Sequence, residues 1–131
     1  MNKTFGRLRV LILEDEPLIQ MAMTVILEVE GHRVSTAETA AGAIEIARLD
    51  QPDVAVLDLN LGTGKPDGVS AALAIMTVSP NTRIIYQTAH HDPLNWSAMM
   101  ATMPEEILSK PVDEARLIRA VAGVAMPGVA A

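Results

Sequence analysis

The sequence predicts a single α/β domain built on a mostly parallel sheet, and two observations carry this prediction. Short apolar, β-branched runs alternate five times with longer stretches of helical periodicity, which is typical of repeated βα units. The length of 131 residues suits one domain, and 50% hydrophobic with 20% charged residues is enough to bury a core. We therefore expect one domain over residues 1–131, with its core at about 7–125 and a frayed tail at 126–131.

The apolar runs predict five strands. The third run is apolar at every position and ends in Asp58, as expected for a central strand covered by helices on both faces. The other runs are shorter or more polar; Gly31 precedes the second run, and the turn Ser79-Pro80-Asn81 precedes the fourth. The five predicted strands are Leu8 to Leu13, Arg33 to Ala37, Val54 to Leu57, Arg83 to Gln87 and Glu106 to Ser109.

Five helices are expected between and after these strands. The first begins near Pro17, which suits a first helical turn, and ends before Gly31. The others cover Ala40 to Leu49, about Val69 to Val78, Pro93 to about Ala101, and Asp113 to Ala125 with Asp113 as its cap. The periodicity of the first helix predicts an apolar face of Leu18, Met21, Ala22, Val25 and Ile26, and His32 after it is expected to be a surface turn residue.

Composition and charge argue against several classes of partner. Aromatic residues make up 2% of the chain and the formal net charge is −6, which disfavours base stacking and binding to phosphate backbones or anionic lipid. The lack of cysteine excludes disulfides and Cys-based zinc sites. The first apolar run ends at Glu14, too early for a signal or spanning segment. We expect a cytoplasmic protein with no direct nucleic-acid or membrane partner.

Polar side chains stand at the carboxyl ends of four predicted strands, the edge where open parallel sheets bind ligands. Three carboxylates gathered there would repel one another unless a cation lay among them. Oxygen ligands without His or Cys favour Mg²⁺ over zinc, and Mg²⁺ commonly also takes phosphate oxygens, so the pattern predicts phosphate chemistry. The positions concerned are Glu14, Asp15, Glu16, Asp58, Thr88, Ala89, Ser109, Lys110 and Pro111.

These strand ends resemble the receiver domain of two-component response regulators. The resemblance rests on Leu-Glu-Asp-Glu-Pro, Leu-Asp-Leu-Asn-Leu, Thr-Ala-His and Ser-Lys-Pro after the first, third, fourth and fifth strands, and it covers about residues 7 to 125. It implies a flavodoxin-like, doubly wound sheet of five parallel strands in the order 2-1-3-4-5. It also implies a stand-alone receiver domain that acts in phosphorelay signalling.

The resemblance assigns a role to three residues around the phosphoryl group. Asp58 is implied to accept it from a sensor histidine kinase, a phosphotransfer protein or a small phosphodonor. Lys110 is implied to pair with Asp58 and afterwards with the phosphoryl group, to which Thr88 would donate its hydroxyl. The chain is thus expected to be a signalling switch and not an enzyme, beyond self-phosphorylation and autodephosphorylation.

A metal site is implied as well. Glu14, Asp15 and Asp58 would hold Mg²⁺ together with the backbone carbonyl of Asn60. The downstream protein target is unknown. Protein binding, a phosphate sink and onward relay all stay open as outputs, and so does a phosphorylation-dependent dimer.

The sequence departs from the family pattern at two places. Ile107 stands where the family usually has a Tyr or Phe, so we expect phosphorylation to be coupled to output through reordering of residues 90–102. The loop after Asp58 has Gly62 in place of the usual Pro, and Asp67-Gly68 comes two residues late. Lys65 in this loop is expected to be solvated. His90 and His91 are expected to be exposed turn residues, with His90 able to modulate access of water to an acyl phosphate.

Two rival functions follow from other classes of protein. A phosphatase with an Asp nucleophile would need a second acid two residues later, where Asn60 stands. A degenerate receiver that serves as a phosphate-independent interaction module is the stronger alternative, because of Ile107 and the altered loop.

Overall fold

The computed structural model describes residues 7–61, 67–89 and 93–125 of the chain. All five predicted strands and all five predicted helices are present, with ends that differ from the prediction by a residue or so. The predicted tail at 126–131 lies outside the described residues. In chain order the elements are β1 (Arg9–Leu13), α1 (Pro17–Val29), β2 (Arg33–Ala37), α2 (Ala40–Asp50), β3 (Val54–Asp58), α3 (Gly68–Val78), β4 (Arg83–Thr88), α4 (Pro93–Ala101), β5 (Glu106–Ser109) and α5 (Glu114–Val124).

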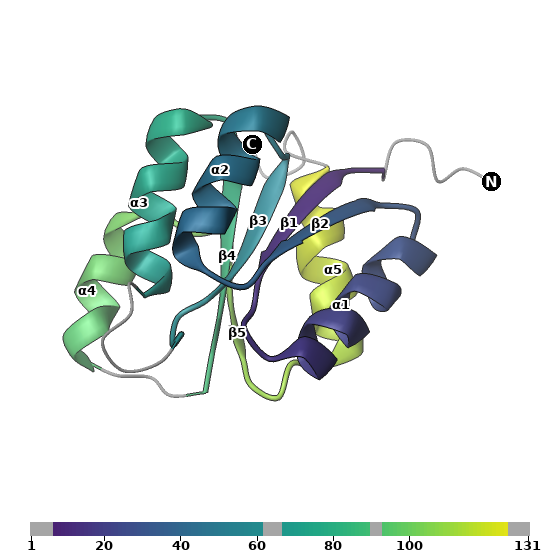
Figure 1. The fold of residues 1–131 in the computed structure, drawn as a ribbon. Helices are drawn as coiled ribbons and strands as arrows, with labels where there is room; N and C mark the ends of the chain where they lie inside the picture. Colours follow the sequence, from purple (N-terminus) through teal and green to yellow (C-terminus); the bar gives the residue numbers. More distant parts are fainter. Residues whose placement is uncertain (1–6, 62–66, 90–92, 126–131) are drawn as a thin grey trace.

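The strands form one parallel sheet in the order β2-β1-β3-β4-β5, which confirms the predicted fold and strand order. Leu13 pairs with both Ala37 and Leu57, so β1 ends beside the ends of its two neighbours. Asp58 pairs with Gln87, and Thr88 with Ser109. The ends of all five strands therefore lie along one edge, which is the lower edge of the sheet in Figure 1.

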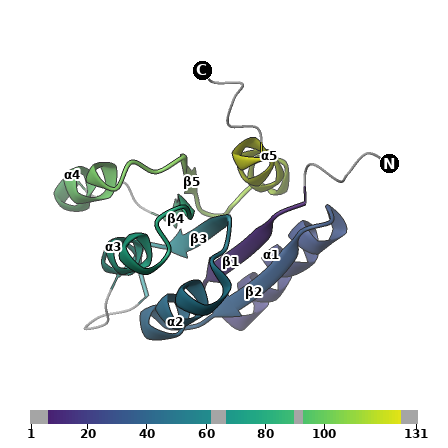
Figure 2. The ribbon, with the colours of Figure 1, turned by 90° about the horizontal axis from the view of Figure 1, so that it is seen from above.

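Helices cover both faces of the sheet and bury two hydrophobic cores (Figure 1). One core lies under α2, α3 and Met99 of α4, and the other lies under α1 and α5. Alternate residues of each central strand point to opposite faces, so Leu57 enters the first core and Val56 the second. Figure 2 shows the same layers from above. Every residue of β3 is buried, as its continuous apolar run predicts.

Side-chain caps begin three of the helices. Thr39, Asp67 and Asp113 each accept a hydrogen bond from a backbone N–H in the first turn of the helix that follows. Pro17 begins α1, where its missing N–H costs no helical hydrogen bond. None of the helices in the described part of the chain combines the length and apolar character needed to cross a bilayer.

The predicted apolar face of α1 is mostly not the face that packs on the sheet. Leu18, Met21 and Val25 are exposed, whereas Met23 and Leu27 are buried. Apolar side chains cover most of the circumference of this helix, so its periodicity does not distinguish the buried part of the apolar arc from the exposed part. The buried face contacts the second core, as does Ile26 of the predicted face, whereas Leu18, Met21 and Val25 form an exposed apolar stripe.

His32 is buried, and its prediction as a surface turn residue is wrong. Its Nδ1 accepts a hydrogen bond of 3.0 Å from the backbone N–H of Leu8, which ties the turn before β2 to the start of β1. Burial lowers the pKa of this imidazole, against the smaller opposing effect of the Glu30 charge. The neutral ring that accepts this hydrogen bond is therefore favoured by the fold.

Candidate functional site

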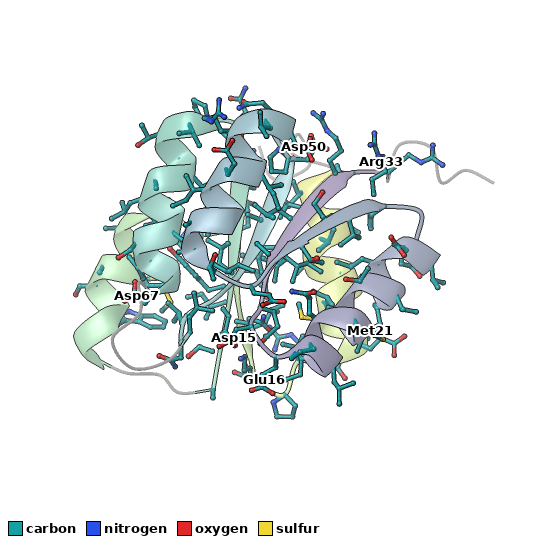
Figure 3. All side chains as sticks on the ribbon, viewed as in Figure 1. Asp15, Glu16, Met21, Arg33, Asp50 and Asp67 are labelled. Atoms are coloured by element: carbon teal, nitrogen blue, oxygen red, sulfur yellow. The ribbon has the colours of Figure 1, made fainter. Side chains whose placement is uncertain are left out.

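The predicted site residues lie at the carboxyl edge of the sheet. Figure 3 shows Asp15 and Glu16 at this edge, directly after β1, and Arg33 at the opposite edge, where β2 begins. Asp58 ends the central strand and Thr88 ends its neighbour β4. Lys110 follows β5, and the Lys110–Pro111 peptide bond is cis. The parallel topology thus gathers residues from four separate segments of the chain.

Three carboxylates form a cluster at this edge. One oxygen each from Glu14, Asp15 and Asp58 lie within 4.8 Å of one another. The side chains of Glu14 and Asp58 are almost completely buried, at 0% and 1% exposure, and Asp15 is half-buried. Carboxylates this close repel one another and lack the solvation that would offset the repulsion. The cluster therefore requires cationic partners.

Lys110 supplies one positive charge to the cluster. Its Nζ lies 2.9 Å from Asp58 Oδ2 and 3.6 Å from Glu14 Oε1. Burial alone would lower the pKa of Lys110, but the hydrogen bond and charge of Asp58, together with the Glu14 charge, outweigh it and raise the pKa. Among the residues that the structure describes, one ammonium faces three carboxylates, which leaves the cluster with excess negative charge.

Glu14 is held in place by contacts from three directions. Its Oε2 accepts from the backbone N–H of Glu16 at 3.1 Å, and its Oε1 accepts from Gln87 Nε2 at 2.9 Å and faces Lys110. Burial raises the pKa of Glu14, and the charges of Asp58 and Asp15 add to this effect. The Glu16 N–H and Lys110 act in the opposite direction.

Gln87 was not among the residues predicted for the site. It lies in β4 beside Asp58 and is completely buried. The available signal was a polar residue at the end of the apolar run Ile84-Ile85-Tyr86, which is unexpected in a strand covered on both faces. Its partner Glu14 is far away in the sequence, so no local pattern predicts their contact.

The backbone around Asp58 is closely packed. Asp58 Oδ1 accepts a hydrogen bond of 3.1 Å from the backbone N–H of Asn60, and the backbone N–H of Gly68 donates to the carbonyl of Leu59. A Cβ on Gly68 would lie 2.5 Å from the Asp58 carbonyl oxygen. The Asp67-Gly68 pair therefore places the start of α3 against the end of β3, although it comes two residues later than in the family pattern.

Thr88 and Tyr86 point to the same face of β4, the face on which α4 packs. Thr88 is buried, and its carbonyl accepts from the backbone N–H of Lys110 at 2.8 Å. Ile107 is half-buried and pairs in the sheet with Tyr86, whose hydroxyl shares a 2.7 Å hydrogen bond with Thr102. Tyr86 thus joins β4 to the residue that follows α4. Gly62, Lys65, His90 and His91 lie outside the described residues.

An apolar hollow opens beside the carboxylate cluster. Its volume is about 530 Å³, and it is lined by residues of α1, the β5–α5 loop and α5. Lys110 and Gln87 form part of its wall, and so does the exposed Leu18. The charged site and an accessible apolar surface are therefore adjacent.

The donor set of the cluster fits a hard divalent cation. Glu14, Asp15 and Asp58 offer only oxygen ligands, which Mg²⁺ prefers, and their excess negative charge would be neutralised by it. An aspartate at the end of a central strand, paired with a lysine and adjacent to such a cation, is suited to receive a phosphoryl group.

Comparisons with a family model, a curated relative and a solved structure each match nearly the whole chain. The model of the response regulator receiver domain family matches residues 10–122. Over 118 residues, covering 88% of this chain and 96% of the relative, the chain is 26% identical to the protein PilH of Pseudomonas aeruginosa. A solved signal receiver domain of a modulated diguanylate cyclase from Desulfovibrio desulfuricans is 27% identical, with a TM-score of 0.83, covering 94% of this chain and 97% of that one.

A shorter match has higher identity. Over 52 residues the chain is 48% identical to the transcriptional regulatory protein KdpE of Mycobacterium tuberculosis, which is 40% of this chain and 23% of that protein. The match thus spans less than a quarter of this longer relative.

Proposed function

Because the chain belongs to the response regulator receiver domain family, a family of signalling phosphoacceptors, we propose that it is a Mg²⁺-dependent switch phosphorylated on Asp58. The donor would be a sensor histidine kinase or a histidine phosphotransfer protein, and the output would be a change in protein binding. The observation that carries the proposal is the 2.9 Å pair of Asp58 with Lys110 at the end of the central strand, inside a cluster of three carboxylates. The proposal includes a cytoplasmic location, because a kinase that draws on ATP works there.

In the proposed reaction a carboxylate oxygen of Asp58 attacks the phosphorus atom of the donor. An O–P bond forms as the N–P bond to the donor histidine breaks, and the histidine, which carries a proton on its other ring nitrogen, leaves as neutral imidazole. Asn60 orients the carboxylate through its N–H, and Lys110 balances charge before and after transfer. A Mg²⁺ ion held by Glu14, Asp15, Asp58 and the Asn60 carbonyl would supply further neutralisation of the transferring oxygens.

The donor protein must reach Asp58 from the carboxyl edge of the sheet. The exposed apolar surface next to this edge is the start of α1 with the hollow beside Lys110. We assign the docking of the donor to this surface, since burial of apolar side chains is the main source of affinity in such contacts.

Thr88 and the α4 region would transmit the effect of phosphorylation to the partner-binding surface. The Thr88 hydroxyl would bind the new phosphoryl oxygens, and α4 would respond through the backbone after β4. Tyr86 links this region to β4 through its hydrogen bond to Thr102, which follows α4. This link supports a coupling of phosphorylation to α4 that needs no aromatic residue at position 107. The complete set of Glu14, Asp15, Asp58 and Lys110 favours the switch over a phosphate-independent interaction module.

Mass spectrometry after treatment with acetyl phosphate and Mg²⁺ tests the proposed phosphoacceptor. We expect the added mass of one phosphoryl group on the unaltered chain, none on Asp58→Asn, and none when EDTA removes the metal. Asp53→Asn is a matched control at the other end of β3, where the side chain accepts a hydrogen bond from the backbone N–H of Arg9. The proposal is wrong if Asp58→Asn is still labelled, or if the unaltered chain is not labelled by acetyl phosphate or by any histidine kinase.

A further inference from the structure

Gln87 is a polar side chain enclosed in the core of the molecule. It has no exposed surface and lies in the sheet between Asp58 of β3 and Leu108 of β5. Its side chain points to the same face of β4 as Ile85, toward α1 and α5. An apolar residue of the same size would suit this environment better if packing were the only requirement.

The amide of Gln87 makes a directed contact with the carboxylate cluster. A carboxylate oxygen accepts hydrogen bonds, so Nε2 of Gln87 is the atom that faces Glu14 Oε1, at 2.9 Å. Lys110, which also faces this oxygen, is shared with Asp58 and lies farther away, at 3.6 Å. Gln87 is therefore a neutral, fixed donor to Glu14 from a neighbouring strand.

This orientation leaves the amide oxygen of Gln87, Oε1, without a hydrogen-bond donor among the described residues. Gln87 Oε1 is the only buried side-chain nitrogen or oxygen without a hydrogen-bond partner among the residues that the structure describes. A buried carbonyl without a partner is destabilising, and a methionine at this position would avoid the cost. Packing alone thus does not explain Gln87, whose side chain makes its directed contact, among the described residues, with Glu14.

We infer that Gln87 is a positioning residue for the metal site, holding the Glu14 carboxylate in the orientation in which it contributes to Mg²⁺ binding. This inference rests on the proposed function, because it assumes that the cluster binds Mg²⁺. Residues that donate hydrogen bonds to metal-ligating side chains typically change metal affinity 10- to 100-fold when they are replaced. Gln87 acts through Glu14 and does not contact the phosphoryl group or the metal itself.

Isothermal titration of Mg²⁺ into the metal-free chain tests the inference with Gln87→Met, which keeps the length of the side chain and removes both amide groups. We expect the Kd for Mg²⁺ to rise about 10-fold. We also expect the stability of the metal-free variant in urea to change little, because removing the unpaired carbonyl offsets the loss of the hydrogen bond to Glu14. A role in packing alone predicts lower stability with an unchanged Kd, and that result would overturn the inference.

Two further variants make the test specific. Ile85→Met changes packing on the same face of β4 and is expected to leave the Kd unchanged. In a Glu14→Gln background, Gln87→Met should have little further effect, because the two residues act as one unit. Equal losses of affinity with and without the Glu14 carboxylate would count against positioning.

Nitrogen-15 NMR of the unaltered chain covers the case in which Gln87→Met does not fold. We expect the side-chain amide signals of Gln87 to exchange slowly with solvent and to shift on Mg²⁺ titration, with the Kd found by calorimetry. Signals that stay constant through saturation would overturn the inference but leave the proposed function intact. If the unaltered chain binds no Mg²⁺ at all, both fail.

Discussion

Gly68 lies where the first turn of α3 comes closest to the end of β3. A Cβ at this position would meet three backbone atoms, the carbonyl oxygen and carbon of Asp58 and the Cα of Leu59, at 2.5 to 3.0 Å. Backbone atoms cannot rotate out of the way as a flexible side chain can. The lack of a side chain at residue 68 therefore sets the position of the backbone that carries the proposed phosphoacceptor.

Gly68→Ala is expected to lower the free energy of unfolding by about 1–3 kcal/mol, the usual cost of inserting a methyl group into a closely packed site. It should also slow labelling by acetyl phosphate, because the Asp58 backbone must shift. Urea denaturation and the labelling rate measure the two effects.

Gly123→Ala is the matched control for this change. A Cβ at Gly123 has no neighbour within 4 Å, and the residue lies inside helix α5. We expect this variant to be more stable by up to about 1 kcal/mol, with unchanged labelling. If both variants behaved alike, space around Gly68 would not be what positions Asp58.

At the scale of single elements, α1 combines a buried and an exposed apolar face. Met23 and Leu27 pack on the sheet, while Leu18 and Val29 are 80% and 74% exposed. Met21, also exposed, is seen on the outer side of the helix in Figure 3. An exposed apolar row of this kind is typical of a contact surface, and its Leu18 end lies beside the carboxylate cluster.

Leu18→Ser is expected to slow phosphotransfer from a sensor kinase that labels the unaltered chain by about 10-fold. The reason is that a leucine buried in an interface contributes roughly 1.5–3 kcal/mol. Labelling by acetyl phosphate should be unchanged, because this small donor needs no protein surface. The ratio of the two rates is the measurement.

Val29→Ser is the control, since it removes an equally exposed apolar side chain at the far end of the same helix. It should leave both rates unchanged. A reduction of both rates by Leu18→Ser would indicate damage to the site itself, and an equal effect of the two substitutions on the kinase rate would contradict docking at the start of α1.

At the scale of the whole molecule, the fold collects negative charge at one edge of the sheet. The chain carries a formal net charge of −6, and three of its carboxylates lie within 4.8 Å of one another beside the ammonium of Lys110. The free energy that holds these groups together comes from the two hydrophobic cores, because the charges themselves oppose the arrangement. A cation that binds only the folded chain should therefore stabilise the whole domain.

Mg²⁺ at 100 times its Kd is expected to raise the free energy of unfolding by about 2.7 kcal/mol, as mass action requires for a ligand of the folded state. Asp58→Asn should lose most of this gain and should be no less stable than the unaltered chain in EDTA, because one repelling carboxylate is gone. Urea denaturation with EDTA and with Mg²⁺ measures both. Sodium chloride at the same ionic strength is the control, and equal stabilisation by it would indicate general screening instead of a site.

The architecture and the main residues of the candidate site can be predicted from local patterns in the sequence. Apolar runs and helical periodicity predict the elements, and the family resemblance supplies the strand order. Because parallel strands all end at one edge, a polar residue at the end of a run is placed by topology alone. For this reason Glu14, Asp15, Asp58 and Lys110 could be expected together before any contact was known.

Features that depend on contacts between distant segments are set when the chain folds and cannot be predicted from local patterns. Helix α1 is apolar over most of its circumference, so packing against the sheet selects its buried face. His32 is buried with its Nδ1 accepting a hydrogen bond from the backbone N–H of Leu8, just before β1. Gln87 reaches Glu14 only because β4 and β1 both flank β3. A local pattern records which side chains are apolar or polar, but side-chain partners are set by the three-dimensional packing of the elements.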